Sequence, residues 1–143
     1  YTNVKGGMTN WNYFLDKDNF KNFFTYLINK HQTTHPQLFE YFLERYAVTN
    51  AWGNEIKTND SLNHHTHPCW HGILYLTKGC DLYLPELNIK ITPEPGNYYI
   101  FPPEVIHGFD KSQEQNNRYS LIFNIQQANE FNFKKKLKEK NER

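Results

Sequence analysis

The sequence predicts a mainly β domain, a sandwich or barrel of short strands that two helices precede. Two observations favour this class: apolar residues recur at helical spacing over the first part of the chain, and short strand-like segments separated by turn signals follow. At 143 residues the chain fits one domain with one hydrophobic core. Because 17% of the residues are aromatic, Phe, Tyr and Trp are expected to supply much of the buried area.

The helical part is expected over about residues 13–46. In "DKDNFKNFFTYLINK" the apolar residues follow an i, i+3, i+4, i+7, i+8 pattern, and Asp18 suits the N-cap. The segment "HPQLFEYFLERY" repeats that pattern, and Pro36 suits a first turn. Each helix should therefore lay one apolar stripe against the rest of the domain.

The β-rich part is expected over about residues 47–126. Its strand candidates are short and rich in β-branched and aromatic residues, and the tight turns "TKG" and "PEPG" fall among them. Such strands at close spacing favour a sandwich or barrel over parallel βαβ units. Residues 127–143 then form a charged, solvated tail. The candidates are "AVTNAWGNEI", "HGILYLT", "CDLYLP", "NIKIT", "NYYIF" and "RYSLIFNIQ".

Composition argues against several classes of partner. A net charge of +1 gives no field that would attract nucleic acid or an anionic membrane. No apolar stretch approaches the roughly 18 residues of a membrane span, and no signal peptide is visible. Cys69 and Cys80 do not make a disulfide framework, so a cytoplasm is the expected setting, a host's if the gene is phage-borne. Exposed sheet edges would permit a homodimer.

Four of the seven histidines crowd into "NHHTHPCWHGILYL", residues 63–76. If this stretch is a strand, His65 and His67 project to one side and His64 to the other, and Pro68 ends the strand. Two imidazoles on one face can bind one metal ion at about 2.0–2.1 Å each. The pattern thus indicates a metal site.

A third imidazole comes from His107 in "PGNYYIFPPEVIHGF". Three ligands from two distant strands would make a facial site that leaves coordination positions open. The alternative is a partly buried loop histidine whose hydrogen bond is satisfied within the protein.

The segment "NNRYSLIFNI" adds a polar pair to an otherwise apolar strand. Alternation places Arg118 and Ser120 on one face with Ile122, opposite Tyr119 and its apolar neighbours. Burying an arginine without a partner is costly, and a carboxylate ligand would remove that cost through the bidentate guanidinium fork. Alternatively Arg118 begins the strand at a solvated edge and pairs with Asp110 or Glu114.

Read in order, "HTH…HGILYL…PEPGNYYIFPPEVIHGF…RYSLIFN" resembles the iron(II)- and 2-oxoglutarate-dependent oxygenases, and most of all the small bacterial and phage-type members. The resemblance covers roughly residues 50–126. It implies a double-stranded β-helix, a cupin-like jelly roll, and an enzyme that uses Fe(II), 2-oxoglutarate and O2 to hydroxylate a substrate while releasing succinate and CO2.

The resemblance also implies roles for particular residues. His65 and His67 match the proximal metal ligands, and His107 matches the distal one. Arg118 matches the residue that binds the distal carboxylate of 2-oxoglutarate. Two residues would assist it there: Ser120 and Tyr75. The substrate is left open between a peptide side chain, a free amino acid and a small metabolite.

One position departs from the family pattern. His67 stands where most members have Asp or Glu, so the ligand set is less anionic, unless Asp60 or Glu55 supplies the acid instead. His71 falls where a serine is common and is expected near the site without binding metal.

Two other interpretations compete with the oxygenase. A cupin would share the fold and the three histidines, as another dioxygenase, an isomerase or a binding module without catalysis. The R-x-S element, Arg118 and Ser120, favours the 2-oxoglutarate-dependent oxygenase over the cupin, because a cupin does not require such an element. A structural zinc site using Cys69 is the third, but zinc usually takes a second Cys-x-x-Cys pair that this chain lacks.

Overall fold

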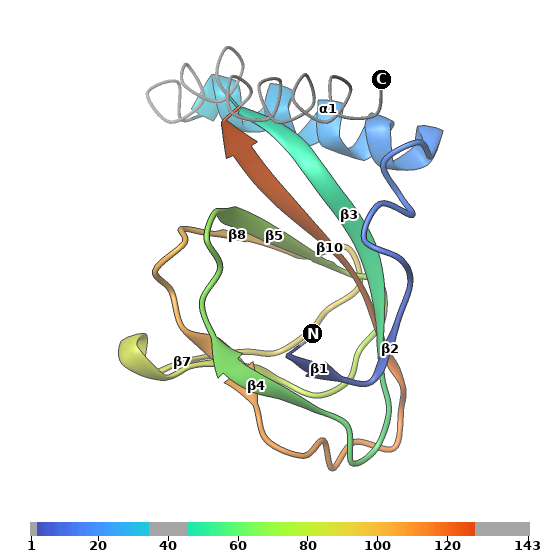
Figure 1. The fold of residues 1–143 in the computed structure, drawn as a ribbon, viewed down its shortest axis with the longest axis vertical. Helices are drawn as coiled ribbons and strands as arrows, with labels where there is room; N and C mark the ends of the chain where they lie inside the picture. The colour runs from blue at the N-terminus through green and yellow to red at the C-terminus, as the bar shows by residue number, and fades with distance from the viewer. Residues whose placement is uncertain (1–2, 35–45, 128–143) are drawn as a thin grey trace, which may run out of the picture.

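The computed structural model describes residues 3–34 and 46–127, which form two facing antiparallel sheets of five strands and one helix (Figure 1). The lower sheet has the order β1-β4-β9-β6-β7 and contains β1 (Val4–Lys5), β4 (Ser61–His65), β9 (His107–Phe109), β6 (Leu82–Leu84) and β7 (Ile89–Ile91). The upper sheet has the order β2-β3-β10-β5-β8 and contains β2 (Gly7–Met8), β3 (Tyr46–Ile56), β10 (Arg118–Gln127), β5 (Trp70–Tyr75) and β8 (Tyr98–Phe101).

Helix α1 (Asp18–Thr34) covers the outer face of the upper sheet (Figure 1). Its apolar stripe supplies Phe20 and Leu27, which are buried in one cluster with Phe123 of β10. The rings of Phe20 and Phe123 lie 5.9 Å apart. The helix therefore forms because the i, i+3, i+4 stripe finds an apolar sheet face to cover.

Strand β10 is buried on both faces, and its alternation decides which side chains reach the interior. Leu121, Phe123 and Ile125 face the helix, whereas Arg118, Ser120 and Ile122 face the space between the sheets. The cross-strand register extends this inner face to β5, where Tyr75 pairs with Ser120. The inner face of the upper sheet thus carries both core residues and candidate site residues.

Gly72 of β5 is required by this packing. A Cβ at this position would point toward the helix side and lie 2.2 Å from Cζ of Phe123, which is completely buried. Glycine lets β5 approach the Phe123 ring closely. Its neighbours His71 and Ile73 point to the opposite side and are buried in the interior.

The mainly β jelly roll is confirmed, and so is the first helix. The six strand candidates are all found, with ends that differ by up to two residues. Strands β1, β2 and β9 are additional, and so is β4, apart from the stretch around His65. The second expected helix lies outside the described residues, except for Tyr46, which begins β3; the charged tail beyond residue 127 lies outside them too.

Within the described residues, no helix combines the length and hydropathy that crossing a membrane requires. A 3-10 turn, η1 (Pro85–Leu87), joins β6 to β7.

Candidate metal and carboxylate site

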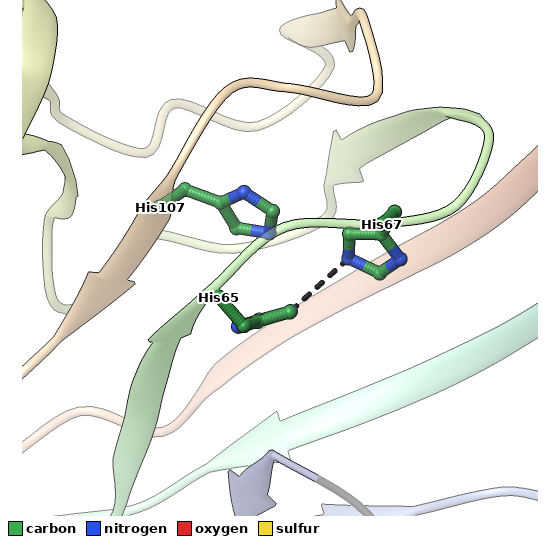
Figure 2. Close-up of side chains that lie close together, drawn as sticks. All are labelled: His65, His67 and His107. Atoms are coloured by element: carbon green, nitrogen blue, oxygen red, sulfur yellow. Dashed lines mark hydrogen bonds between the residues drawn. The ribbon is translucent and has the colours of Figure 1, made fainter.

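Three histidines meet on the inner side of the lower sheet (Figure 2). His65 ends β4 and His107 begins β9, and the two are direct cross-strand partners. His67 lies two residues beyond the end of β4. One nitrogen of each ring lies within 4.8 Å of the others, and this is the one group of its kind in residues 3–34 and 46–127.

The route by which His67 reaches the group differs from the expectation. The strand was expected to continue to Pro68, but β4 ends at His65, so alternation does not place His67. Instead the following loop turns, and the backbone N–H of His67 donates to the carbonyl of Pro103 at 3.3 Å. Residues 102–105 beside His107 thus anchor the loop that carries His67.

Backbone carbonyls set the tautomers of His65 and His107. Nδ1 of His107 donates to the carbonyl of Val105 at 3.0 Å, and Nδ1 of His65 donates to the carbonyl of Asn63. A carbonyl only accepts, so both rings carry their proton on Nδ1 and present the lone pair of Nε2. A hydrogen bond from the ring nitrogen that does not bind the metal is the usual way in which proteins orient a metal-binding imidazole.

The spacing of the facing ring nitrogens of His65 and His67 fits a shared ion. Nε2 of His65 lies 3.1 Å from Nε2 of His67 (Figure 2). Two nitrogens bound to one ion at about 2.1 Å would show this separation at an angle of about 95°. The nitrogens of the full set lie within 4.8 Å of one another, so a bound ion would draw the rings slightly together, and three imidazoles are a donor set that suits a divalent transition metal.

The environment keeps these rings neutral at physiological pH. Burial lowers the pKa of His107 to about 4, against a backbone hydrogen bond that raises it. Burial also lowers the pKa of His67 to about 4, and the neighbouring His107 and His65 add to the effect. Burial is also the main reason that the pKa of His65 is lowered. Neutral imidazole is the form that binds a metal.

A fourth imidazole, that of His71 on the upper sheet, contacts this group. Its ring stacks on His67 with centroids 3.9 Å apart and on His107 at 4.7 Å. It is 3% exposed, and burial lowers its pKa to about 2. It does not belong to the converging set of nitrogens, so the expectation that His71 is near the site, but not a ligand, agrees with this geometry.

Arg118 lies in the interior and not at a solvated edge. It is 2% exposed and lines the same cavity as His65, His67 and His107. Its Nη1 donates to the carbonyl of Cys80 at 2.9 Å, while its Nε has no partner. No carboxylate pairs with it in the described part of the chain, which removes the suggested pairs with Asp110 and Glu114.

Tyr75 and Ser120 lie beside Arg118 as cross-strand partners. Both are essentially buried, and neither hydroxyl has a hydrogen-bond partner in residues 3–34 and 46–127. The guanidinium lies 5.5 Å from the centre of the Tyr75 ring. Burial raises the pKa of Tyr75, so its hydroxyl stays protonated and able to donate. Nε of Arg118 and the hydroxyls of Tyr75 and Ser120 are thus three buried polar atoms that lack a hydrogen-bond partner among the described residues.

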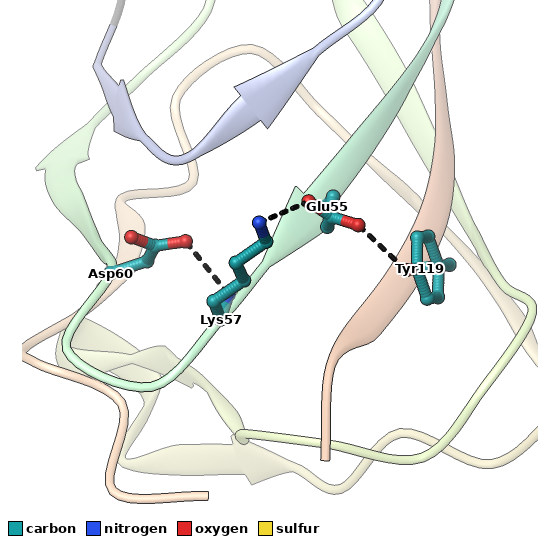
Figure 3. A network of polar contacts seen from close by, with 4 residues as sticks. All are labelled: Glu55, Lys57, Asp60 and Tyr119. Carbon is teal, nitrogen blue, oxygen red and sulfur yellow. Dashed lines mark hydrogen bonds and ion pairs between the residues drawn. The ribbon is translucent and has the colours of Figure 1, made fainter. Parts of the chain in front are cut away.

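The acidic residues suggested as substitutes for His67 lie elsewhere. Glu55 faces outward from β3, accepts a hydrogen bond from the Tyr119 hydroxyl at 2.6 Å and pairs with Lys57 at 3.3 Å (Figure 3). The same hydrogen bond to Tyr119 is the main reason that the pKa of Glu55 is lowered. Asp60 accepts from the backbone N–H of Lys57 at 2.7 Å. Neither joins the three histidines, and neither does Cys69.

Two cavity residues were missed by the sequence analysis. Trp52 and Asn54 of β3 line the cavity, and Nε1 of Trp52 and Oδ1 of Asn54 are buried without partners. The alternation of β3 could have indicated them, because Trp52, Asn54 and Ile56 have the same parity. A larger, open hollow of about 810 Å³ contains none of the three histidines; it borders His64 and Tyr83.

Comparison with solved structures identifies the fold. No protein-family model matches the sequence, and no curated protein matches it. A viral collagen prolyl hydroxylase from Paramecium bursaria Chlorella virus 1, solved with 2-oxoglutarate, matches with a TM-score of 0.67 at 12% identity, over 87% of this chain and 80% of that one. A 2OG-Fe(II) oxygenase family protein from Burkholderia pseudomallei matches with a TM-score of 0.50 at 14% identity, over 59% of this chain and 46% of that one.

A cupin domain from Bordetella pertussis also matches, with a TM-score of 0.46 at 18% identity, over 58% of this chain and 83% of that one. The likeness to the first two structures shows that the chain has the jelly-roll fold that 2-oxoglutarate- and iron(II)-dependent oxygenases adopt. At these identities the likeness concerns the fold, and the reaction has to be argued from the site.

Proposed function

We propose that the protein is a non-haem iron oxygenase that uses 2-oxoglutarate and O2 to hydroxylate a substrate, with release of succinate and CO2. The observation that carries the proposal is Arg118: a buried guanidinium without an acidic partner that shares one cavity with three convergent imidazoles. A diacid that is bound to the metal at one end and to Arg118 at the other would satisfy both features.

The electrostatic argument for a carboxylate is direct. A guanidinium removed from water without a counter-charge costs several kcal/mol, by order of magnitude, and the one hydrogen bond to Cys80 compensates only part of this. A carboxylate offers two oxygens to the guanidinium fork and a third contact to a hydroxyl. We propose that Tyr75 and Ser120 supply such a contact, because their buried hydroxyls lack a partner among the described residues and they are cross-strand neighbours of each other next to Arg118.

In this proposal His65, His67 and His107 hold Fe(II) through neutral nitrogens. The bound iron would supply the activation of O2 that the side chains themselves cannot perform. The protein's own part is to orient the co-substrate between the two sheets and to exclude water with apolar walls, among them Ile73, Leu82 and Ile122. Because the cavity encloses about 50 Å³, its walls must shift apart to admit a five-carbon diacid.

Turnover without a primary substrate tests the proposal. Protein freed of metal, then given Fe(II) and 2-oxoglutarate in air, should release succinate by the uncoupled reaction. The His107→Ala and Arg118→Met variants, handled in parallel, should release little or none. A wild-type protein that binds Fe(II) but forms no succinate, and does not bind 2-oxoglutarate under anaerobic conditions, would refute the assignment in favour of a cupin-type metal protein.

The primary substrate is proposed to be a peptide side chain or a small metabolite, and a homodimer is proposed only as an arrangement that the sheet edges permit.

A further inference from the structure

His71 is the one buried imidazole of the cavity that the proposed function does not use. It projects inward from β5, since the adjacent Gly72 faces Phe123 on the opposite side. Its ring is 3% exposed, lines the cavity and stacks on both His67 and His107. Three stacked rings therefore bound the metal end of the cavity from two sheets.

The nitrogens of His71 are not arranged for metal binding, yet one of them lacks a partner. His71 is absent from the converging donor set. Its Nδ1 is buried without a hydrogen bond, in contrast to Nδ1 of His65 and of His107, each of which donates to a carbonyl. An unsatisfied buried nitrogen is costly unless a bound molecule completes it.

We infer that His71 donates a hydrogen bond from Nδ1 to the carboxylate that a 2-oxo acid places on the metal. The inference rests on the proposed function, and it adds a positioning residue at the opposite end of the co-substrate from Arg118. Three neutral imidazoles leave the charge of a divalent ion uncompensated, so an anionic oxygen is the group expected beside the ion. The His71 ring lines the same cavity as the three ligands and contacts two of them, so it borders the space that such an oxygen would occupy.

Because 2-oxoglutarate has a carboxylate at each end, the contributions of His71 and Arg118 to its binding can be tested separately. Pyruvate has the 2-oxo carboxylate but lacks the distal one, so its binding should depend on His71 and not on Arg118. 2-Oxoglutarate should depend on both residues. Binding is measured without O2 on Fe(II)-loaded protein, from the charge-transfer absorption of the iron–2-oxo-acid chelate, and metal content is measured separately.

Three substitutions at one position distinguish hydrogen bonding from packing. His71→Phe keeps a stacking ring without a nitrogen and should weaken both pyruvate and 2-oxoglutarate by about 10-fold or more. His71→Asn places an amide nitrogen near the position of Nδ1 and should restore binding to within about 3-fold. His71→Gln places its amide near Nε2 and should not. All three should retain Fe(II), and the position of the absorption band should move in the Phe and Gln variants only.

Several outcomes would overturn the inference. Equal binding in wild type and His71→Phe would make the ring a packing element, and loss of Fe(II) from the variants would make His71 a ligand. If His71→Phe fails to fold, the comparison of His71→Asn with His71→Gln still tests the inference, because equal affinities of these two variants for pyruvate would exclude Nδ1 as the hydrogen-bond donor. A wild-type protein that takes neither Fe(II) nor a 2-oxo acid would refute the proposed function itself, and this inference with it.

Discussion

Replacing Arg118 with methionine separates a ligand-binding arginine from a structural one. Arg118 is 2% exposed, donates one hydrogen bond to the carbonyl of Cys80 and has no acidic partner in the described residues. Methionine retains an unbranched apolar stem of similar length but has no charge and no donor. The substitution therefore removes the proposed carboxylate contact and, at the same time, an uncompensated buried charge.

The two effects have opposite consequences for stability and binding. Loss of the hydrogen bond to Cys80 costs about 1.5–3 kcal/mol, and removal of the buried charge returns a similar amount. The free energy of unfolding of the ligand-free protein should then change by less than about 1 kcal/mol. A bidentate guanidinium–carboxylate contact of about 3 kcal/mol corresponds to a loss of about 100-fold in 2-oxoglutarate affinity.

Urea unfolding followed by tryptophan fluorescence, with and without 2-oxoglutarate on metal-loaded protein, measures both quantities. At 100 times its Kd, 2-oxoglutarate should stabilise the wild type by about 2.7 kcal/mol and the variant by almost nothing. Lys21→Met, on the exposed side of α1, is the matched loss of a cation and should behave as wild type. A variant that is about 3 kcal/mol less stable and binds 2-oxoglutarate normally would refute the reasoning.

Three further changes have defined outcomes. His107→Ala should abolish metal binding, measured by equilibrium dialysis, while circular dichroism shows the fold retained; stoichiometric iron in that variant would exclude His107 as a ligand. Because the folded pKa values of His67 and His107 are about 4, below the ordinary 6.5, the unfolded chain binds more protons between these values. The metal-free protein should therefore be fully stable above pH 6.5 and lose several kcal/mol as the pH falls to 4, at about 1.4 kcal/mol per pH unit for each ring before the discount for solvent access; urea midpoints that do not vary with pH would contradict this. Gly72→Ala, whose Cβ would lie 2.2 Å from the Phe123 ring, should cost about 1–3 kcal/mol and lower Tm by calorimetry; an unchanged Tm would mean that the ring moves freely.

Long periodic segments were predictable from the sequence because burial imposes a repeat on them. The stripe that begins at Phe20 indicates α1, and the alternation of β10 correctly separates Arg118 and Ser120 from the helix-facing residues. The approach of His65 to His107 was predictable only through the resemblance, since spacing along the chain does not show which strands become neighbours.

The features that were missed depend on tertiary contacts. Strands β1 and β2 are two residues each, too short to show any period. His67 is placed by a loop bonded to Pro103, so its apparent agreement with strand alternation had a different cause. Trp52 and Asn54 were included only in a strand candidate; the alternation of β3 places them on one face, but the pairing of β3 with β10 is needed to show that this face borders the cavity.

Under the proposed function, the division of the site between the two sheets makes the distance between the sheets set the length of the diacid that can be bound. The three convergent histidines belong to the lower sheet and its loop, whereas Arg118 belongs to the upper sheet. Apolar side chains packed between the sheets, such as Ile73 and Leu82, fix the gap, and therefore the number of carbons that can join two carboxylates across it. Enlarging or trimming those side chains is a route to a protein that prefers a longer or a shorter 2-oxo diacid.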